Sequence, residues 1–88
     1  MSKIIYVARS RDYFNINSNN IRIFNNPEDA HKFTIDRLFS FLDNDTEIKE
    51  EDKKHTKDLI PDKYPHEEDS YEYFNDGMVG FWVEKHFI

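Results

Sequence analysis

The segment from Asn26 to Asp43 constrains the fold most, because its pattern predicts a helix that needs cover on two sides. Asn26 can cap the helix, and Pro27 suits its first position. Two acids follow, which suits the positive end of a helix. On a helical wheel five polar side chains fall within one arc about 80° wide: Asp29, Lys32, Asp36, Ser40 and Asp43. Apolar side chains fill most of the remainder, so a sheet should cover one side and the Tyr-rich C-terminal segment or another subunit the other.

Three strands are predicted around this helix. Residues 3–9 carry apolar side chains on both alternating faces, as expected of a central strand. An Asn-rich loop at 11–20 leads to a second, antiparallel strand at 21–24. Residues 78–88 alternate cleanly and predict a terminal strand.

The remaining segments are more polar. Residues 47–59 are almost entirely charged and predict a peripheral helix that depends on docking its ends. Residues 66–76 mix acids with aromatics and are interpreted as a loop or one helical turn. The chain therefore predicts a single α+β domain over residues 1–88, with a small, mainly antiparallel sheet of about three strands. One amphipathic helix should pack across that sheet, and the charged helix should lie at the periphery.

Composition limits the cellular compartment and the classes of binding partner that we expect. The 88 residues include no cysteine and no long apolar stretch, so we expect a cytoplasmic protein without disulfides or a membrane span. The net charge is −6 and is polarised along the chain, at +2 over residues 1–40 and −8 over residues 41–88. This balance argues against direct nucleic-acid binding, which needs a clustered positive surface, and favours a basic protein partner.

No pattern of catalytic, metal-binding or cofactor-binding residues is present. The four histidines lie in different predicted elements, and His31 falls among apolar positions of the helix, which indicates a core residue rather than a ligand. Two glycines, Gly77 and Gly80, cannot build a phosphate-binding loop. We therefore expect no cofactor, no metal and no enzymatic activity, with an enzyme of unfamiliar type as the remote alternative.

An acidic segment with tyrosines is the leading candidate for a protein-interaction surface. Tyrosine supplies rigid contact area, and carboxylates steer toward a basic target, as a nucleic-acid mimic would. The alternative interpretation is that the rings cover the helix while the acids face water, and both can hold together. The candidate residues are Asp62, Glu67, Glu68, Asp69, Tyr71, Glu72, Tyr73 and Asp76.

A second candidate site uses arginines near the first hairpin. Arg9, Arg11 and Arg22 lie close in sequence to the aromatic residues Tyr13 and Phe14. Guanidinium groups bind anions with two parallel hydrogen bonds and stack on rings. This alternative predicts a small-molecule or nucleotide binder.

Three stretches, K-I-I-Y-V-A, F-N-N-P-E-D-A-H-K-F and F-W-V-E-K-H-F-I, resemble small accessory proteins that phages and other viruses encode, including anti-CRISPR and related anti-defence inhibitors. The resemblance is one of style over the whole length, and it carries no functional residue onto this sequence. It implies inhibition by binding a host protein in the host cytoplasm. A homodimer through Trp82, Phe87 and Ile88 is a further expectation.

Overall fold

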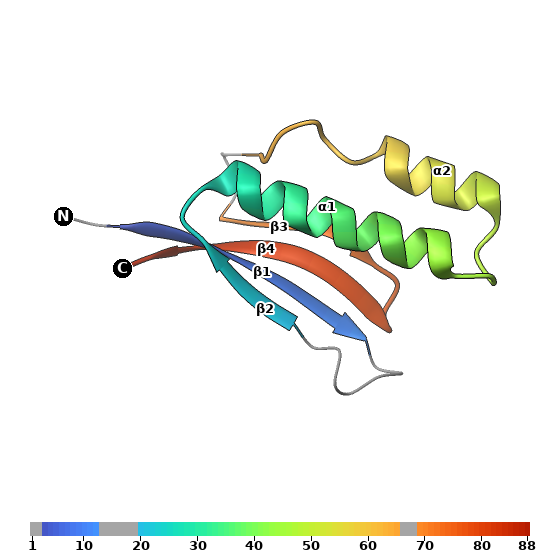
Figure 1. Ribbon diagram of the computed structural model, residues 1–88, viewed down its shortest axis with the longest axis horizontal. Helices are drawn as coiled ribbons and strands as arrows, with labels where there is room; N and C mark the ends of the chain where they lie inside the picture. The colour runs from blue at the N-terminus through green and yellow to red at the C-terminus, as the bar shows by residue number, and fades with distance from the viewer. Residues whose placement is uncertain (1–2, 13–19, 66–68) are drawn as a thin grey trace.

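The computed structural model describes residues 3–12, 20–65 and 69–88. Its strands are β1 (Ile4–Asp12), β2 (Asn20–Phe24), β3 (Ser70–Asn75) and β4 (Val79–Phe87), and its helices are α1 (Pro27–Asn44) and α2 (Glu50–Asp58). The strands form one antiparallel sheet in the order β2-β1-β4-β3 (Figure 1). The predicted α+β fold, with a helix across a small antiparallel sheet, is confirmed. The sheet has one strand more than predicted.

The central position of β1 is confirmed, and so is the antiparallel hairpin that it forms with β2. Val7 and Ala8 point to opposite faces of the sheet by alternation, yet both are buried. Ala8 is on the side that α1 covers, and Val7 lies between its cross-strand neighbours Ile23 and Glu84. The predicted loop at 11–20 begins too early. Arg11 and Asp12 pair with β4 and extend β1, while residues 13–19 lie outside the described part of the chain.

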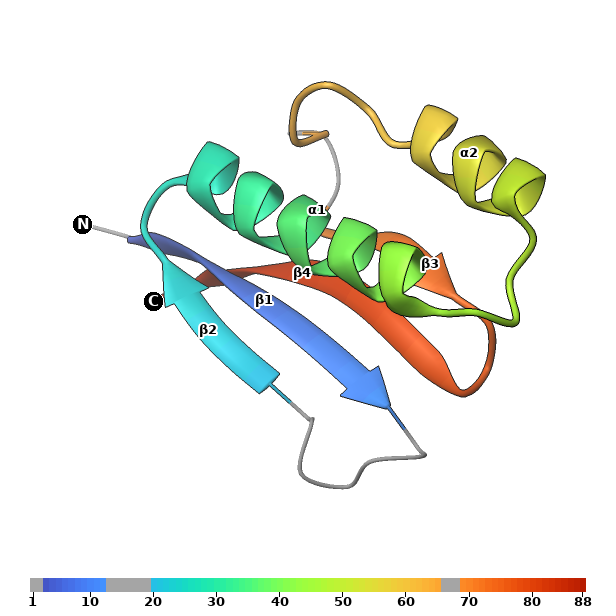
Figure 2. The same ribbon diagram turned by 45° about the vertical axis from the view of Figure 1, so that its right-hand side comes forward.

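Helix α1 crosses one face of the sheet, and both helices lie on that side (Figure 2). Its start follows the sequence pattern, since the Asn26 side chain accepts a hydrogen bond from the Glu28 backbone N–H at 2.8 Å. All five residues of the predicted polar stripe are exposed. Leu38 and Leu42 are fully buried in the core, and Phe33 and Phe41 pack against it while remaining partly exposed. The helix is therefore held to the sheet by the side chains that the pattern indicated.

The fourth strand, β3, corrects the interpretation of residues 66–76 as a loop or a helical turn. Residues 70–75 pair with β4, and their register shifts between Glu72 and Phe74. This bulge lets two successive rings contact α1, because the Tyr73 hydroxyl meets His31 and the Phe74 ring lies 5.8 Å from the Phe41 ring. An ordinary strand would turn two successive side chains to opposite faces.

Three residues build the turn between β3 and β4: Asn75, Asp76 and Gly77. The Asn75 side chain accepts a hydrogen bond from the Gly77 backbone N–H at 2.8 Å. Gly77 has a φ of 92°, a left-handed conformation that side chains disfavour. The Asp76 carboxylate accepts hydrogen bonds from the Met78 and Val79 backbone N–H groups at 2.8 and 2.7 Å. One role of Asp76 is thus to fix the turn.

Helix α2 lies beside α1 and is peripheral, as predicted. It begins three residues later than expected, because the Asp45 carboxylate accepts hydrogen bonds from the backbone N–H groups of Glu47 and Ile48 and holds them in a turn. Lys57 links the two helices. Its Nζ lies 2.7 Å from Asp43 Oδ1 and 5.1 Å from the centre of the Phe39 ring. In the part of the chain that is described, neither helix is long and apolar enough to cross a membrane.

Candidate functional site

The aromatic rings of the acidic segment belong to the core. Tyr64 is only 1% exposed, and its ring meets the Tyr6 ring edge-on at 5.5 Å. Tyr73 is buried as well, with the partly buried Tyr71 ring 4.9 Å away. Tyr73 and Phe74 do contact the first helix, as the alternative interpretation predicts, but from a strand of the same sheet rather than from a second side. Tyr73 is not part of the exposed surface.

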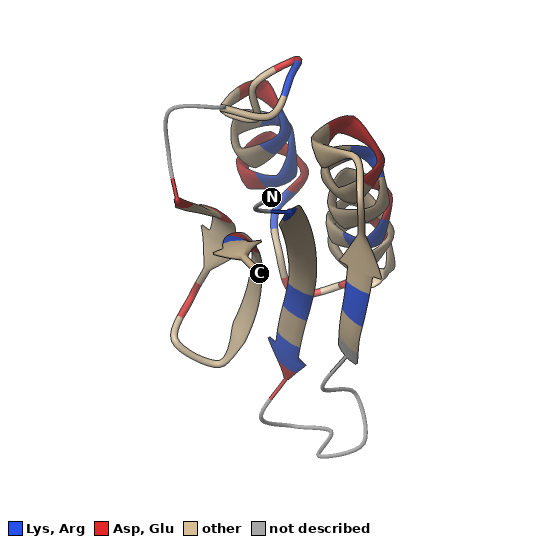
Figure 3. Cartoon of the chain, turned by 90° about the vertical axis from the view of Figure 1, so that its left-hand side faces the viewer, with Lys and Arg blue, Asp and Glu red and all other residues tan. Residues whose placement is uncertain are grey.

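The carboxylates of the same segment lie on the outside. Asp62, Asp69, Glu72 and Asp76 are all exposed, while Glu67 and Glu68 lie outside the described residues. Figure 3 shows this distribution, with acidic bands along the β3–β4 hairpin and basic bands on β1 and β2. The rings therefore anchor a strand whose acids face outward.

His31 supplies the anchor, which confirms its interpretation as a core histidine. Its Nε2 lies 3.0 Å from the Pro61 carbonyl, an obligate acceptor, so Nε2 carries the proton. Its Nδ1 then accepts from the Tyr73 hydroxyl at 2.7 Å. Burial raises the pKa of Tyr73, which keeps that hydroxyl protonated as a donor. One buried imidazole thus fixes both β3 and the segment after α2 against α1.

The face of the sheet away from the helices has no described element packed on it, and Trp82 lies at its centre. Trp82 is opposite Arg9 on one side and opposite Glu72 on the other. A hollow of about 260 Å³ lies beside it, bordered by Arg11, Ser70, Glu72, Asn75 and Gly80. We name this surface, from Arg9 to Glu72 through Trp82, the open face.

Glu84 organises a hydrogen-bonded cluster on the open face. It accepts from Arg9 Nε at 3.0 Å and from Trp82 Nε1 at 2.8 Å, and His86 Nε2 lies 2.9 Å from its Oε1. Burial alone would raise the pKa of Glu84, but the hydrogen bonds from Trp82 and His86, with the charge of Arg9, lower it below its usual range. The carboxylate is therefore ionised at neutral pH, and it fixes the orientation of the indole ring.

The three arginines of the alternative site are not brought together. Arg9 and Arg11 point to the open face by alternation, with Arg9 paired to Glu84. Arg22 is on the helix side, where its guanidinium lies 5.2 Å from the Phe33 ring and 5.8 Å from the Phe24 ring. Tyr13 and Phe14 lie outside the described residues. A single anion site built from all three arginines is not assembled.

The acidic site and the arginine site, which the sequence predicts as separate alternatives, meet on the open face. Glu72 belongs to one and Arg9 to the other, and the strand register places both beside Trp82. Sequence reasoning placed Trp82 only in a dimer contact, because the pairing of β3 was not foreseen.

No arrangement of three or more His, Asp or Glu side chains able to hold a metal ion occurs within the described residues. Comparison with protein-family models, with curated proteins and with solved structures gives no match.

Proposed function

We propose that this protein acts without catalysis, as an inhibitor that binds a basic site on another protein. It would bind through the exposed acids Asp69 and Glu72, which we call the β3 edge, and through the open face. The observation that carries the proposal is the orientation of β3. Its rings are packed inward against α1, while Glu72 on the strand and Asp69 directly before it are exposed. Those rings hold the strand in place. Rigidly placed carboxylates steer and orient a basic partner without the cost of ordering a flexible segment.

The open face adds the kind of residue that dominates binding energy. Trp82 is partly exposed, and tryptophan and arginine are enriched among the residues that contribute most at interfaces. The Glu84 cluster holds the indole before any partner arrives, which lowers the entropy lost on binding. We further propose that the chain is encoded by a phage or another virus and acts in the host cytoplasm, in line with the resemblance of its sequence.

Charge reversal at the β3 edge tests the proposal. Asp69→Lys with Glu72→Lys should leave the fold intact, since exposed substitutions usually change stability by less than about 0.5 kcal/mol each. Capture of the partner from host lysate should fall by about tenfold or more, because a close charge pair contributes on the order of 1.5 kcal/mol or more. Binding by the wild type should also weaken with added salt.

The matched control is Glu47→Lys with Glu51→Lys, which changes the total charge equally on exposed residues next to and within α2. We expect this variant to retain the partner. Small, equal effects of both double substitutions would mean that the acids of the β3 edge only face water and do not bind a partner. Equally severe losses would mean that total charge, rather than the β3 edge, drives binding.

The sequence also predicts a homodimer through Trp82, Phe87 and Ile88, of which Trp82 lies on the open face and Phe87, by alternation along β4, on the helix side. Because rings from β3 already contact the first helix, the remaining reason to expect a homodimer is the exposure of apolar side chains on and beside the strands. Ile21 and Ile23 are each 61% exposed, Phe87 is 62% exposed and Ile88 is 66% exposed. Light scattering at rising micromolar concentration should show a mass that climbs above 10.7 kDa if these residues pair. A constant mass of one chain would remove the homodimer.

A further inference from the structure

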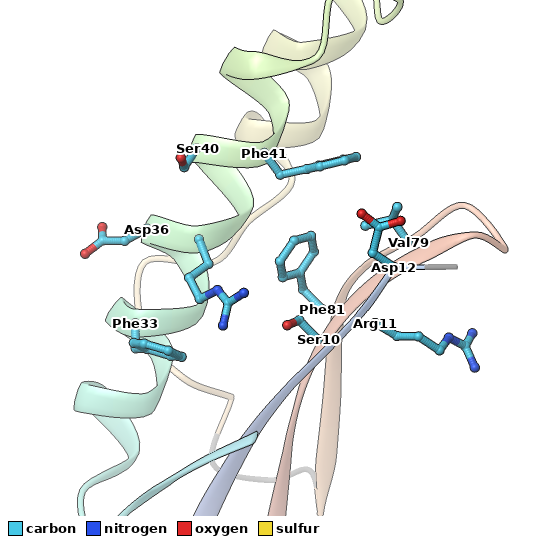
Figure 4. Close-up of a pocket in the computed structure, with 10 residues that line it drawn as sticks. Ser10, Arg11, Asp12, Phe33, Asp36, Ser40, Phe41, Val79 and Phe81 are labelled. Carbon is cyan, nitrogen blue, oxygen red and sulfur yellow. The ribbon is translucent and has the colours of Figure 1, made fainter. Parts of the chain in front are cut away.

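A groove lies on the helix side of the sheet, separate from the open face. It runs between α1 and the end of the β1–β4 pair, and its volume is about 430 Å³ (Figure 4). This volume is within the range of roughly 300–1,000 Å³ that small-molecule sites occupy. Its walls are mainly apolar and come from Phe33 and Phe41 on α1 and from Val79 and Phe81 on β4. Such walls suit a flat apolar body.

Ser10 places an unsatisfied polar atom at the base of this groove. Its side chain points toward α1 in Figure 4, and its Oγ is buried with no hydrogen-bond partner among the described residues. A gap of about 10 Å³ next to Ser10 is at the lower limit of roughly 10–15 Å³ for holding one water. A buried hydroxyl without a partner is destabilising, so a ligand atom that reached Ser10 Oγ and paired with it would remove that cost.

Arg37 supplies the positive charge that faces the groove, and the Asp12 carboxylate lies at its rim beside Val79 (Figure 4). Arg37 lines both the groove and the gap beside Ser10, and its guanidinium lies 5.6 Å from the centre of the Phe33 ring. Within the described part of the chain it makes no ion pair. The charged ends of Asp36 and Arg11 point away from the groove in Figure 4. Asp12 already has an interaction partner.

We propose that this groove binds a small aromatic carboxylate. The ring would lie between the phenylalanine walls, the carboxylate would accept hydrogen bonds from the Arg37 guanidinium, and the Ser10 hydroxyl would donate a further one. Arg37 is suited to this role because its planar group can stack on Phe33 and still present two N–H donors to a carboxylate. The site does not depend on the proposed protein partner.

The test uses phenylacetate as the probe, with two matched compounds that each lack one feature. Phenylacetamide keeps the ring without the charge, and acetate keeps the charge without the ring. In a ¹H–¹⁵N NMR titration of the full chain, phenylacetate should give saturable shifts at Ser10, Arg37 and Phe81. A ligand of about ten heavy atoms should bind with a Kd on the order of millimolar. Phenylacetamide should bind about tenfold more weakly, and acetate should give no saturable shift at these residues.

Two substitutions and one control assign the effect to named groups. Arg37→Gln should weaken phenylacetate binding by about tenfold, and Ser10→Ala by about fivefold. Ser10→Ala should leave the thermal midpoint unchanged or raise it, because it removes a buried hydroxyl that has no partner. Arg22→Gln is the control, since Arg22 lies over the same Phe33 ring but does not line the groove, and it should change binding by less than about twofold.

Three results would overturn the proposal: no saturable shift with phenylacetate, equal binding of phenylacetate and phenylacetamide, or equal effects of Arg37→Gln and Arg22→Gln. Loss of capture by the β3 variants would not bear on it, because that edge lies away from the groove.

Discussion

Leu38→Ala is expected to lower the free energy of unfolding by about 2–5 kcal/mol. Leu38 is fully buried in the core cluster that α1 shares with β1 and β4. Truncating it removes apolar contacts and leaves a cavity that an 88-residue domain has little means to refill. Domains of this size have a total stability of about 4–13 kcal/mol, so this one change could remove a large part of it.

Urea denaturation, followed by circular dichroism, measures this effect. Leu59→Ala is the matched control, because the same atoms are removed at a side chain that is 66% exposed, and its cost should stay below about 0.5 kcal/mol. If Leu38→Ala fails to fold, Leu38→Met keeps the volume and should cost less than about 1.5 kcal/mol. Equal midpoints for the two alanine variants would contradict the placement of α1 on the sheet.

The elements predicted correctly are those whose signals are local. The Asn26 cap and the polar stripe of α1 are set by neighbours within one or two turns, and both occur as expected. The apolar run of β1 likewise indicates a strand buried on both faces. These patterns do not depend on what the rest of the chain does.

Strand β3 was missed because its alternation is broken at the bulge. Tyr73 and Phe74 both contact α1, so the period of two that marks a strand is lost across Glu72 to Phe74. Acids at both ends of the segment also favour a loop interpretation. The pairing with β4 that overrides these signals is tertiary and leaves no trace in a single sequence.

The candidate site likewise combines features that local sequence predicts with features that depend on tertiary pairing. That Asp62, Asp69, Glu72 and Asp76 would be exposed while Tyr64 and Tyr73 are buried could be inferred from the residue types. That Glu72, Trp82 and Arg9 would lie in one row depends on the register of three strands. Ser10 and Arg37 carry no sequence signal, because their interest comes from the groove between α1 and the sheet.

His31→Ala is the second substitution with a large expected effect. It removes the side chain that bonds both Tyr73 and the Pro61 carbonyl, so a buried hydroxyl and a partly buried carbonyl lose their partner and a cavity remains. We expect a loss of about 2–4 kcal/mol. His55→Ala, at an exposed position of α2, should cost less than about 0.5 kcal/mol. Urea denaturation at neutral pH compares the two.

Alkaline pH separates the role of the Tyr73 hydroxyl from that of the imidazole. Burial raises the pKa of Tyr73 in the folded protein, whereas an unfolded tyrosine ionises near pH 10. Above about pH 10 the unfolded chain therefore releases a proton that the folded protein retains, and stability must fall as pH rises. Tyr73→Phe removes this group, so its stability should be lower than that of the wild type at pH 7 by about 1–2 kcal/mol but should decline less steeply above pH 10. Parallel decline of both proteins would show that the Tyr73 hydroxyl is not the buried donor to His31.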